Sequence, residues 1–276
     1  MDKEYAIEPV EALPPPPFSP MENRRNSPGS LNTYLAAELS AVHTEFLLLA
    51  CCLSSGLVDS TVYNAYGTFV SMQTGNTIFV GLGGSTSYDT QKPFGWAKSL
   101  LSISTFCFGC FFFTVISRAM SPLRRRTLLT SFLLQTLIIL ATAGMIQGGV
   151  INGSLNTIPD DIDWWQLIPI GLLSFQSAGQ IVASRALGVA EIPSVVVTSM
   201  LHDIASDKAL LKPLNRNIKR NRRILAFFTI LIGAVIGGFI SESTSRMQVP
   251  LWVAGGVKLC ITIAWVTWPV KKLNEG

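Results

Sequence analysis

A few polar and charged residues of this 276-residue chain lie inside long apolar stretches, where such side chains bind a solute or hold helices together. Lys258 is the sharpest example, eight residues after Pro250 and ten before Trp268. At a helical rise of about 1.5 Å per residue, it lies some 12 to 15 Å from either end of its apolar run. A lysine at that depth is expected to face protein and to find a partner.

Asp59 is the expected partner of Lys258, because it is the acidic residue deep in another apolar run. Two interpretations of this pair stay open. An Asp59–Lys258 ion pair would fix the register of two helices, whereas the same groups would bind a substrate or a proton in a transporter. The alternative for Lys258 is a lipid-facing or misplaced side chain.

The stretch from residue 56 to residue 84 contains a break in its helical pattern. An apolar helix that starts near Phe46 carries Asp59 and Asn64 and stops at Gly67, and only about nine apolar or small residues follow Asn76. Crossing a hydrocarbon core takes about 20 helical residues, so this remainder is predicted to be a re-entrant or half-helical segment. Such a break persists in lipid only where protein or a water-filled cavity satisfies its backbone groups.

Thr74, Gly75 and Asn76 are predicted to begin this short helix. The free amides and the positive end of the helix dipole at that point attract an anion or a polar group. Asn76 is equally suited to capping the helix, and both interpretations stay open.

A second broken stretch follows Gly188 and reads VAEIPSVVVTSMLHDIASD. Aligning Gly188 with Gly67 pairs Gln180 with Asp59 and brings Thr198 close to Thr74. Each half, about 44–148 and 164–268, is then a span, a glycine break, a half-helix and two more spans. This predicts a 3+3 inverted repeat, an architecture of secondary transporters in which broken helices meet near the midplane. Gln180 and Thr198 therefore join the candidate substrate-binding residues.

The composition predicts an all-α polytopic membrane protein. The chain is 49% hydrophobic and 14% charged, whereas soluble domains carry about 25% charged residues. Six transmembrane helices are expected, at about 46–66, 95–116, 127–148, 164–187, 224–240 and 250–268, in one domain over residues 41–270. Residues 1–40 are predicted to be a disordered, proline-rich cytoplasmic tail, and residues 271–276 a second cytoplasmic tail.

Basic residues set the expected orientation in the membrane. The loops at 118–126, 208–223 and 271–272 hold 13 Lys and Arg residues, whereas those at 85–98, 149–163 and 241–249 hold three. The first set is expected to be cytoplasmic, which places both termini there.

Several other functions find little support in the sequence. The two histidines are far apart and no acidic pair lies in the spans, so neither an enzyme nor a metal or other cofactor is expected. The basic residues flank spans, so no nucleic acid is expected as a partner. The lipid bilayer is the expected surrounding. Gly144-x-x-x-Gly148 and Gly233-x-x-x-Gly237 favour close packing within the bundle and leave a homodimer open.

Two motifs resemble a known family. GLVDSTVYNAYGTFVSMQTGNT and GQIVASRALGVAEIPSVVVTSMLHD together are similar to the YoaK-like family of uncharacterised multipass membrane proteins (domain of unknown function 1275), over roughly residues 44–268. The resemblance implies a six-span membrane fold and no assigned function.

Two hypotheses for the function follow. The first is a small-molecule transporter or channel-like protein, in which the candidate residues line one polar midplane cavity for a small polar or anionic solute. The second is a membrane assembly or interaction protein, in which the same residues only hold the fold together.

Overall fold

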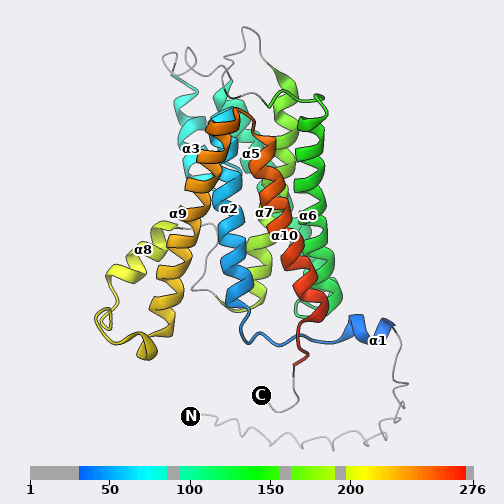
Figure 1. Ribbon diagram of the computed structural model, residues 1–276, viewed down its shortest axis with the longest axis vertical. Coiled ribbons are helices and arrows are strands. Elements are labelled where there is room, and N and C mark those ends of the chain that lie inside the picture. Colours follow the sequence, from blue (N-terminus) through cyan, green and yellow to red (C-terminus); the bar gives the residue numbers. More distant parts are fainter. Residues whose placement is uncertain (1–30, 86–93, 154, 156–162, 190–196, 272–276) are drawn as a thin grey trace, which may run out of the picture.

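The spans form one bundle of parallel and antiparallel helices (Figure 1). The computed structural model describes residues 31–85, 94–153, 155, 163–189 and 197–271. Among these residues six helices are long and apolar enough to cross a membrane. The prediction of an all-α protein with six spans is therefore confirmed.

The six spans agree closely with the predicted ranges. They are α2 (Glu45–Tyr66), α5 (Gly95–Met120), α6 (Arg125–Gln147), α7 (Leu167–Ala186), α9 (Ile218–Thr244) and α10 (Gln248–Thr267). The shorter elements are α1 (Leu31–Ala36), α3 (Gln73–Leu82), α8 (Val197–Ala205) and the 3-10 turns η1 (Trp164–Gln166) and η2 (Leu214–Arg216). At ten and nine residues, α3 and α8 are half-helices, too short to cross a hydrocarbon core.

Glycines mark both breaks. Gly67 follows α2 and Gly188 follows α7, and both adopt a φ of +71°. A side chain disfavours this left-handed conformation, which glycine adopts readily and which commonly ends helices. The two predicted break points are therefore equivalent in backbone conformation.

The packing of the helices follows the predicted inverted repeat. If α2, α3, α5 and α6 correspond to α7, α8, α9 and α10, the extensive α2–α9 contact corresponds to the α7–α5 contact. In the same way α10–α2 corresponds to α6–α7, and α3–α5 to α8–α9. Helix α2 rises from the end of the bundle that carries α1, here called the α1 end, whereas α7 descends towards it (Figure 1). The halves thus run in opposite directions.

Glycines allow the closest approach of helices in both halves. A Cβ atom at Gly233 of α9 would lie 2.3 Å from the carbonyl oxygen of Leu53 in α2. One at Gly109 of α5 would lie 2.8 Å from the carbonyl oxygen of Phe175 in α7. The Gly233 motif therefore packs within the bundle, as expected, whereas a Cβ at Gly144 would meet nothing within 4 Å.

Residues 31–40, which precede the first span, contain a short helix and a buried residue. Helix α1 begins at Leu31, and Leu39 is buried in a hydrophobic cluster. The amide of Leu39 donates to the carbonyl of Leu123, and that of Lys271 donates to Glu38, so this segment is held against the α1 end. The predictions for residues 1–30 and 272–276 lie outside the described residues.

Candidate functional site

Asp59 holds the broken segment after α2. Its Oδ1 atom accepts hydrogen bonds from the amides of Val70 and Ser71, at 2.8 and 3.0 Å, and Oδ2 accepts one from the Ser71 hydroxyl. Ser177 of α7 donates to the carbonyl oxygen of Val70 at 2.9 Å. The carboxylate thus satisfies backbone amides that could not remain unpaired at membrane depth.

Asn76 fixes the same segment from the other side. Its Oδ1 accepts from the Thr68 hydroxyl and the Phe69 amide, at 2.9 and 3.0 Å. Its Nδ2 donates to the Phe69 carbonyl at 2.7 Å and to the Ser102 hydroxyl at 2.9 Å. The residue is fully buried. Asn76 therefore ties the break to α3 and α5 instead of capping α3, whose N-cap residue is Met72.

Lys258 pairs with two glutamines, not with Asp59. Its Nζ donates to Oε1 of Gln135 at 2.7 Å and to Oε1 of Gln180 at 2.6 Å, and its side chain is 1% exposed. Gln180 also donates to the Ser55 hydroxyl at 2.8 Å. The expected Asp59–Lys258 ion pair is not found in the described part of the chain, because the backbone of the break takes the carboxylate.

These residues form a polar layer between two hydrophobic clusters. On α2, α6, α7 and α10, Ser55, Gln135, Gln180 and Lys258 each lie between residues of the cluster near the α1 end and residues of the other cluster. Phe132, in the first cluster, places its ring centre 5.4 Å from Nζ of Lys258. The polar layer therefore joins four helices at the centre of the bundle.

The half-helices α3 and α8 begin at one pocket of about 320 Å³. Thr74 and Gly75 in the first turn of α3 line it, as does Thr198 in the first turn of α8. The other described lining residues are Phe69, Ser71, Met72, Gln73, Phe106, Ile181 and Val197. Ser71 connects the pocket to Asp59, to which its hydroxyl donates.

The structure divides the eight predicted site residues into three sets. Thr74, Gly75 and Thr198 line the pocket. Asp59, Asn76, Gln180 and Lys258 are buried in the hydrogen-bond networks described above. Asn64 is exposed near the end of α2. Of the eight residues, the three of the first set are brought together at this pocket, and the other five do not line it.

Seven of the pocket's described residues were not among the predicted site residues. Ser71 and Gln73 belong to the broken stretch, and their polarity was a usable signal. Phe106 and Ile181 are apolar residues in the middle of apolar spans, so no pattern separates them from residues that face lipid.

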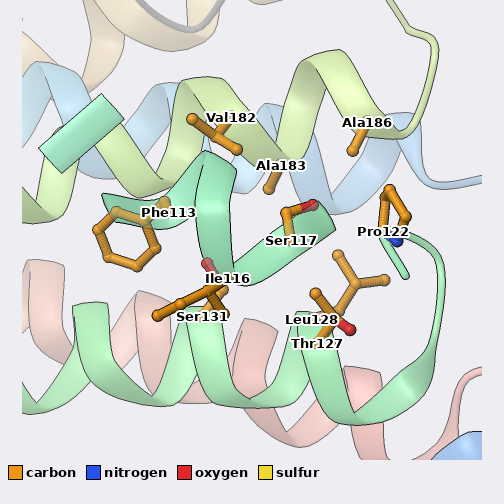
Figure 2. Close-up of a pocket in the computed structure, with 10 residues that line it drawn as sticks. All are labelled: Phe113, Ile116, Ser117, Pro122, Thr127, Leu128, Ser131, Val182, Ala183 and Ala186. Atoms are coloured by element: carbon orange, nitrogen blue, oxygen red, sulfur yellow. The ribbon is translucent and has the colours of Figure 1, made fainter. Parts of the chain in front are cut away.

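A second cavity lies between α5, α6 and α7 towards the α1 end (Figure 2). Its volume is about 20 Å³, which is room for about one water molecule. Ser131, whose hydroxyl accepts from Nε2 of Gln135, points into it (Figure 2). This cavity is too small for an organic solute.

The described residues contain no group of three or more His, Cys, Asp or Glu side chains that could hold a metal ion. The five cysteines, including Cys107 and Cys110, are free thiols.

Residues 47–264 match the family model described as "Protein of unknown function (DUF1275)". The chain belongs to this family. The match covers all six spans in whole or in part and both half-helices, so the pocket and the polar layer lie inside the family region. Searches of the curated proteins and of the solved structures returned no match.

Proposed function

We propose that this DUF1275-family membrane protein is a transporter or channel-like protein that binds a small polar solute between α3 and α8. One observation carries the proposal: the first turns of the two half-helices, which come from opposite halves of an inverted repeat, line one pocket. Broken helices that meet in this way form the substrate sites of many secondary transporters.

The pocket offers suitable chemistry. Helix N-termini present amide groups without intrahelical partners, and their dipoles favour electronegative groups of a ligand. The hydroxyls of Thr74 and Thr198 and the amide of Gln73 supply further polar groups, while Phe69 and Phe106 supply apolar contact. A volume of about 320 Å³ is at the lower end of the range for ligand pockets, which suits a small metabolite.

The solute need not be an anion. Lys258 does not line the pocket and is engaged with Gln135 and Gln180. The remaining preference for electronegative atoms comes from helix N-termini, which carry about half an elementary charge each. Neutral polar solutes therefore belong in a screen beside carboxylates and inorganic anions.

The experiment is a thermal-shift screen of the purified protein with small organic acids, amino acids, nucleobases, polyols and inorganic anions. A ligand at 100 times its dissociation constant stabilises the folded state by about 2.7 kcal/mol. Thr198→Trp fills the pocket and should abolish the shift. Thr77→Trp, at an exposed position of α3 outside the pocket, is the matched control and should retain it.

A hit must then be transported. Proteoliposomes containing the protein should take up the compound faster than empty vesicles, and Thr198→Trp should remove the difference. A compound that stabilises both variants equally binds elsewhere, and this would contradict the proposed site.

The alternative is an assembly or interaction protein without transport. One observation favours it: Asp59, Asn76, Gln180 and Lys258 all make hydrogen bonds that hold the fold together. It predicts that no compound in the screen shifts the wild-type melting temperature. The assembly hypothesis also predicts that Thr198→Trp and Thr77→Trp both remain functional in the cell.

A cytoplasmic α1 end is part of the proposal. In the sequence, the loops at 118–126, 208–223 and 271–272 hold 13 Lys and Arg residues, against three in the loops at 85–98, 149–163 and 241–249. Positively charged loops remain in the cytoplasm during insertion, and both termini follow the α1 end.

A further inference from the structure

An ordered connection joins α8 to α9 at the α1 end. Arg220, buried near the start of α9, donates from Nη1 to the carbonyl oxygens of Lys212, at 2.7 Å, and of Leu210. Asn217 donates to Oδ2 of Asp207 at 2.8 Å. These bonds fix the path of residues 207–219, called here the basic platform.

Apolar side chains project from the basic platform. Leu211 is 97% exposed, Leu214 is 73% exposed and Ile218 is 60% exposed. Because Arg220 and Asn217 hold the backbone, these side chains cannot turn inward without breaking the bonds that order the platform. Clustered exposed aliphatic side chains of this kind mark a surface that binds something apolar.

Basic side chains alternate with the apolar ones. Lys208, Lys212 and Arg216 are exposed. The acidic residue of the platform, Asp207, is engaged by Asn217 and by the amide of Ala209. Leucines beside lysines and an arginine suit the boundary between headgroups and acyl chains in a membrane that contains anionic lipid.

The basic platform also lies next to a span, near the expected membrane boundary. Its last residues begin α9, whose apolar run starts at Ile224, six residues after Ile218, which is about 9 Å along a helix. In Figure 1 α8 and the connection to α9 lie beside the bundle at the α1 end, not beneath it. A membrane leaflet around the spans would therefore meet the platform directly.

We propose that the basic platform docks onto the anionic headgroups of the surrounding leaflet and inserts Leu211 and Leu214 between them. The lysines and the arginine supply attraction to the phosphates, and the leucines supply apolar burial. This surface is distinct from the pocket between α3 and α8. Its test is independent of whether the protein transports anything.

The test measures how fast a membrane-impermeant charged maleimide labels Leu211→Cys in the full-length protein. Vesicles of phosphatidylcholine alone are compared with vesicles that also contain phosphatidylglycerol, and labelling of the native cysteines is subtracted with the wild type. Only the initial rate for the outward-facing molecules is used. We expect the rate to fall about tenfold with phosphatidylglycerol, since burial in the headgroups excludes the reagent.

Asn215→Cys is the matched control, because Asn215 is an exposed polar residue in the same platform. Its labelling reports the general effect of a negative surface on thiol reactivity, and the fall for Leu211→Cys should exceed it severalfold. Adding Lys208→Gln, Lys212→Gln and Arg216→Gln to Leu211→Cys should restore fast labelling. Soluble glycerol phosphate should not protect, which separates a lipid surface from a free phosphate ligand.

Two results would overturn the proposal. One is equal protection of Leu211→Cys in both kinds of vesicle, which would indicate burial independent of anionic lipid, for example against a second copy of the chain. The other is equally fast labelling of Leu211→Cys in both, with no protection at all.

Discussion

The Nζ atom of Lys258 lies 2.7 Å from Oε1 of Gln135, and the two residues belong to α10 and α6, the last spans of the two halves. Each is ten positions after the first residue of its helix, Gln248 in α10 and Arg125 in α6. The central contact of the polar layer therefore joins the two halves through their last spans. One half supplies the donor and the other half its acceptor.

Lys258→Met should destabilise the protein through the glutamines it leaves behind. Two buried Oε1 atoms would lose their donor, and an unsatisfied buried polar group costs about 1–3 kcal/mol. A melting curve in detergent measures the loss. Adding Gln135→Leu should cost less in the Lys258→Met background than in the wild type. Equal costs in both backgrounds would contradict the contact, and Lys271→Met, in the segment after α10, should melt like the wild type.

Asp59→Leu should destabilise the break between α2 and α3 more than Asp59→Asn. Leucine leaves the amides of Val70 and Ser71 unpaired, at about 1–3 kcal/mol each, whereas asparagine keeps one carbonyl oxygen for them. The melting temperatures of the two variants give the order. Asn64→Leu, at an exposed position on the same helix, should change little. Equal losses for Asp59→Leu and Asp59→Asn would show that the negative charge matters more than these bonds.

Gly233→Ala should weaken the contact between α2 and α9. The new methyl group would lie 2.3 Å from the carbonyl oxygen of Leu53, and overpacking of this kind costs about 1–3 kcal/mol. Gly256→Ala in α10 is the control, because nothing lies within 4 Å of its Cβ position. Alanine there should be neutral or stabilising by up to about 1 kcal/mol. Thermal unfolding of the two variants side by side tests the difference.

The basic platform should open in acid. The hydrogen bond from Asn217, followed by the amide of Ala209, lowers the pKa of Asp207 below its ordinary value of 3.8. A lowered pKa means that the ionised carboxylate stabilises the folded platform at and above pH 3.8, and that this stabilisation is lost as the pH falls through the lowered pKa. Hydrogen exchange of residues 207–217 should rise there. Asp203→Asn should leave that transition in place, and Asp207→Ala should already exchange fast at pH 7.

Both termini should be cytoplasmic. A tag after residue 276 should be cleaved by protease in permeabilised cells and protected in intact cells, as expected from the basic residues at the α1 end. A tag inserted in the loop between α9 and α10, near Arg246, should show the opposite behaviour. A C-terminal tag that is cleaved in intact cells would invert the proposed orientation.

The positions of the spans could be predicted almost completely from the sequence. Lipid contains no water to satisfy backbone groups, so apolar length alone identifies a helix that crosses it. The breaks at Gly67 and Gly188 were also visible, because glycine combined with a short apolar remainder leaves few alternatives. The six residues of α1 lie next to a proline-rich stretch that suggests disorder, so the exact start of this helix is not marked by the sequence pattern.

The partners of the buried polar residues could not be predicted in the same way. Asp59 and Lys258 were paired by charge, but hydrogen bonding to the backbone of the break outweighed the attraction between opposite charges. Gln135 was overlooked, since a single glutamine in an apolar helix has no pattern around it.

Local sequence patterns were enough to predict which segments cross the membrane, where two of them break and that the halves run in opposite directions. These features depend on local hydropathy and on backbone conformations that only glycine adopts readily. The packing of the helices, in contrast, places Thr74, Gly75 and Thr198 at one pocket and Asp59 and Lys258 in separate networks. Each buried polar group binds a donor or acceptor that helix packing brings within about 3 Å. That packing depends on contacts between residues far apart in the chain.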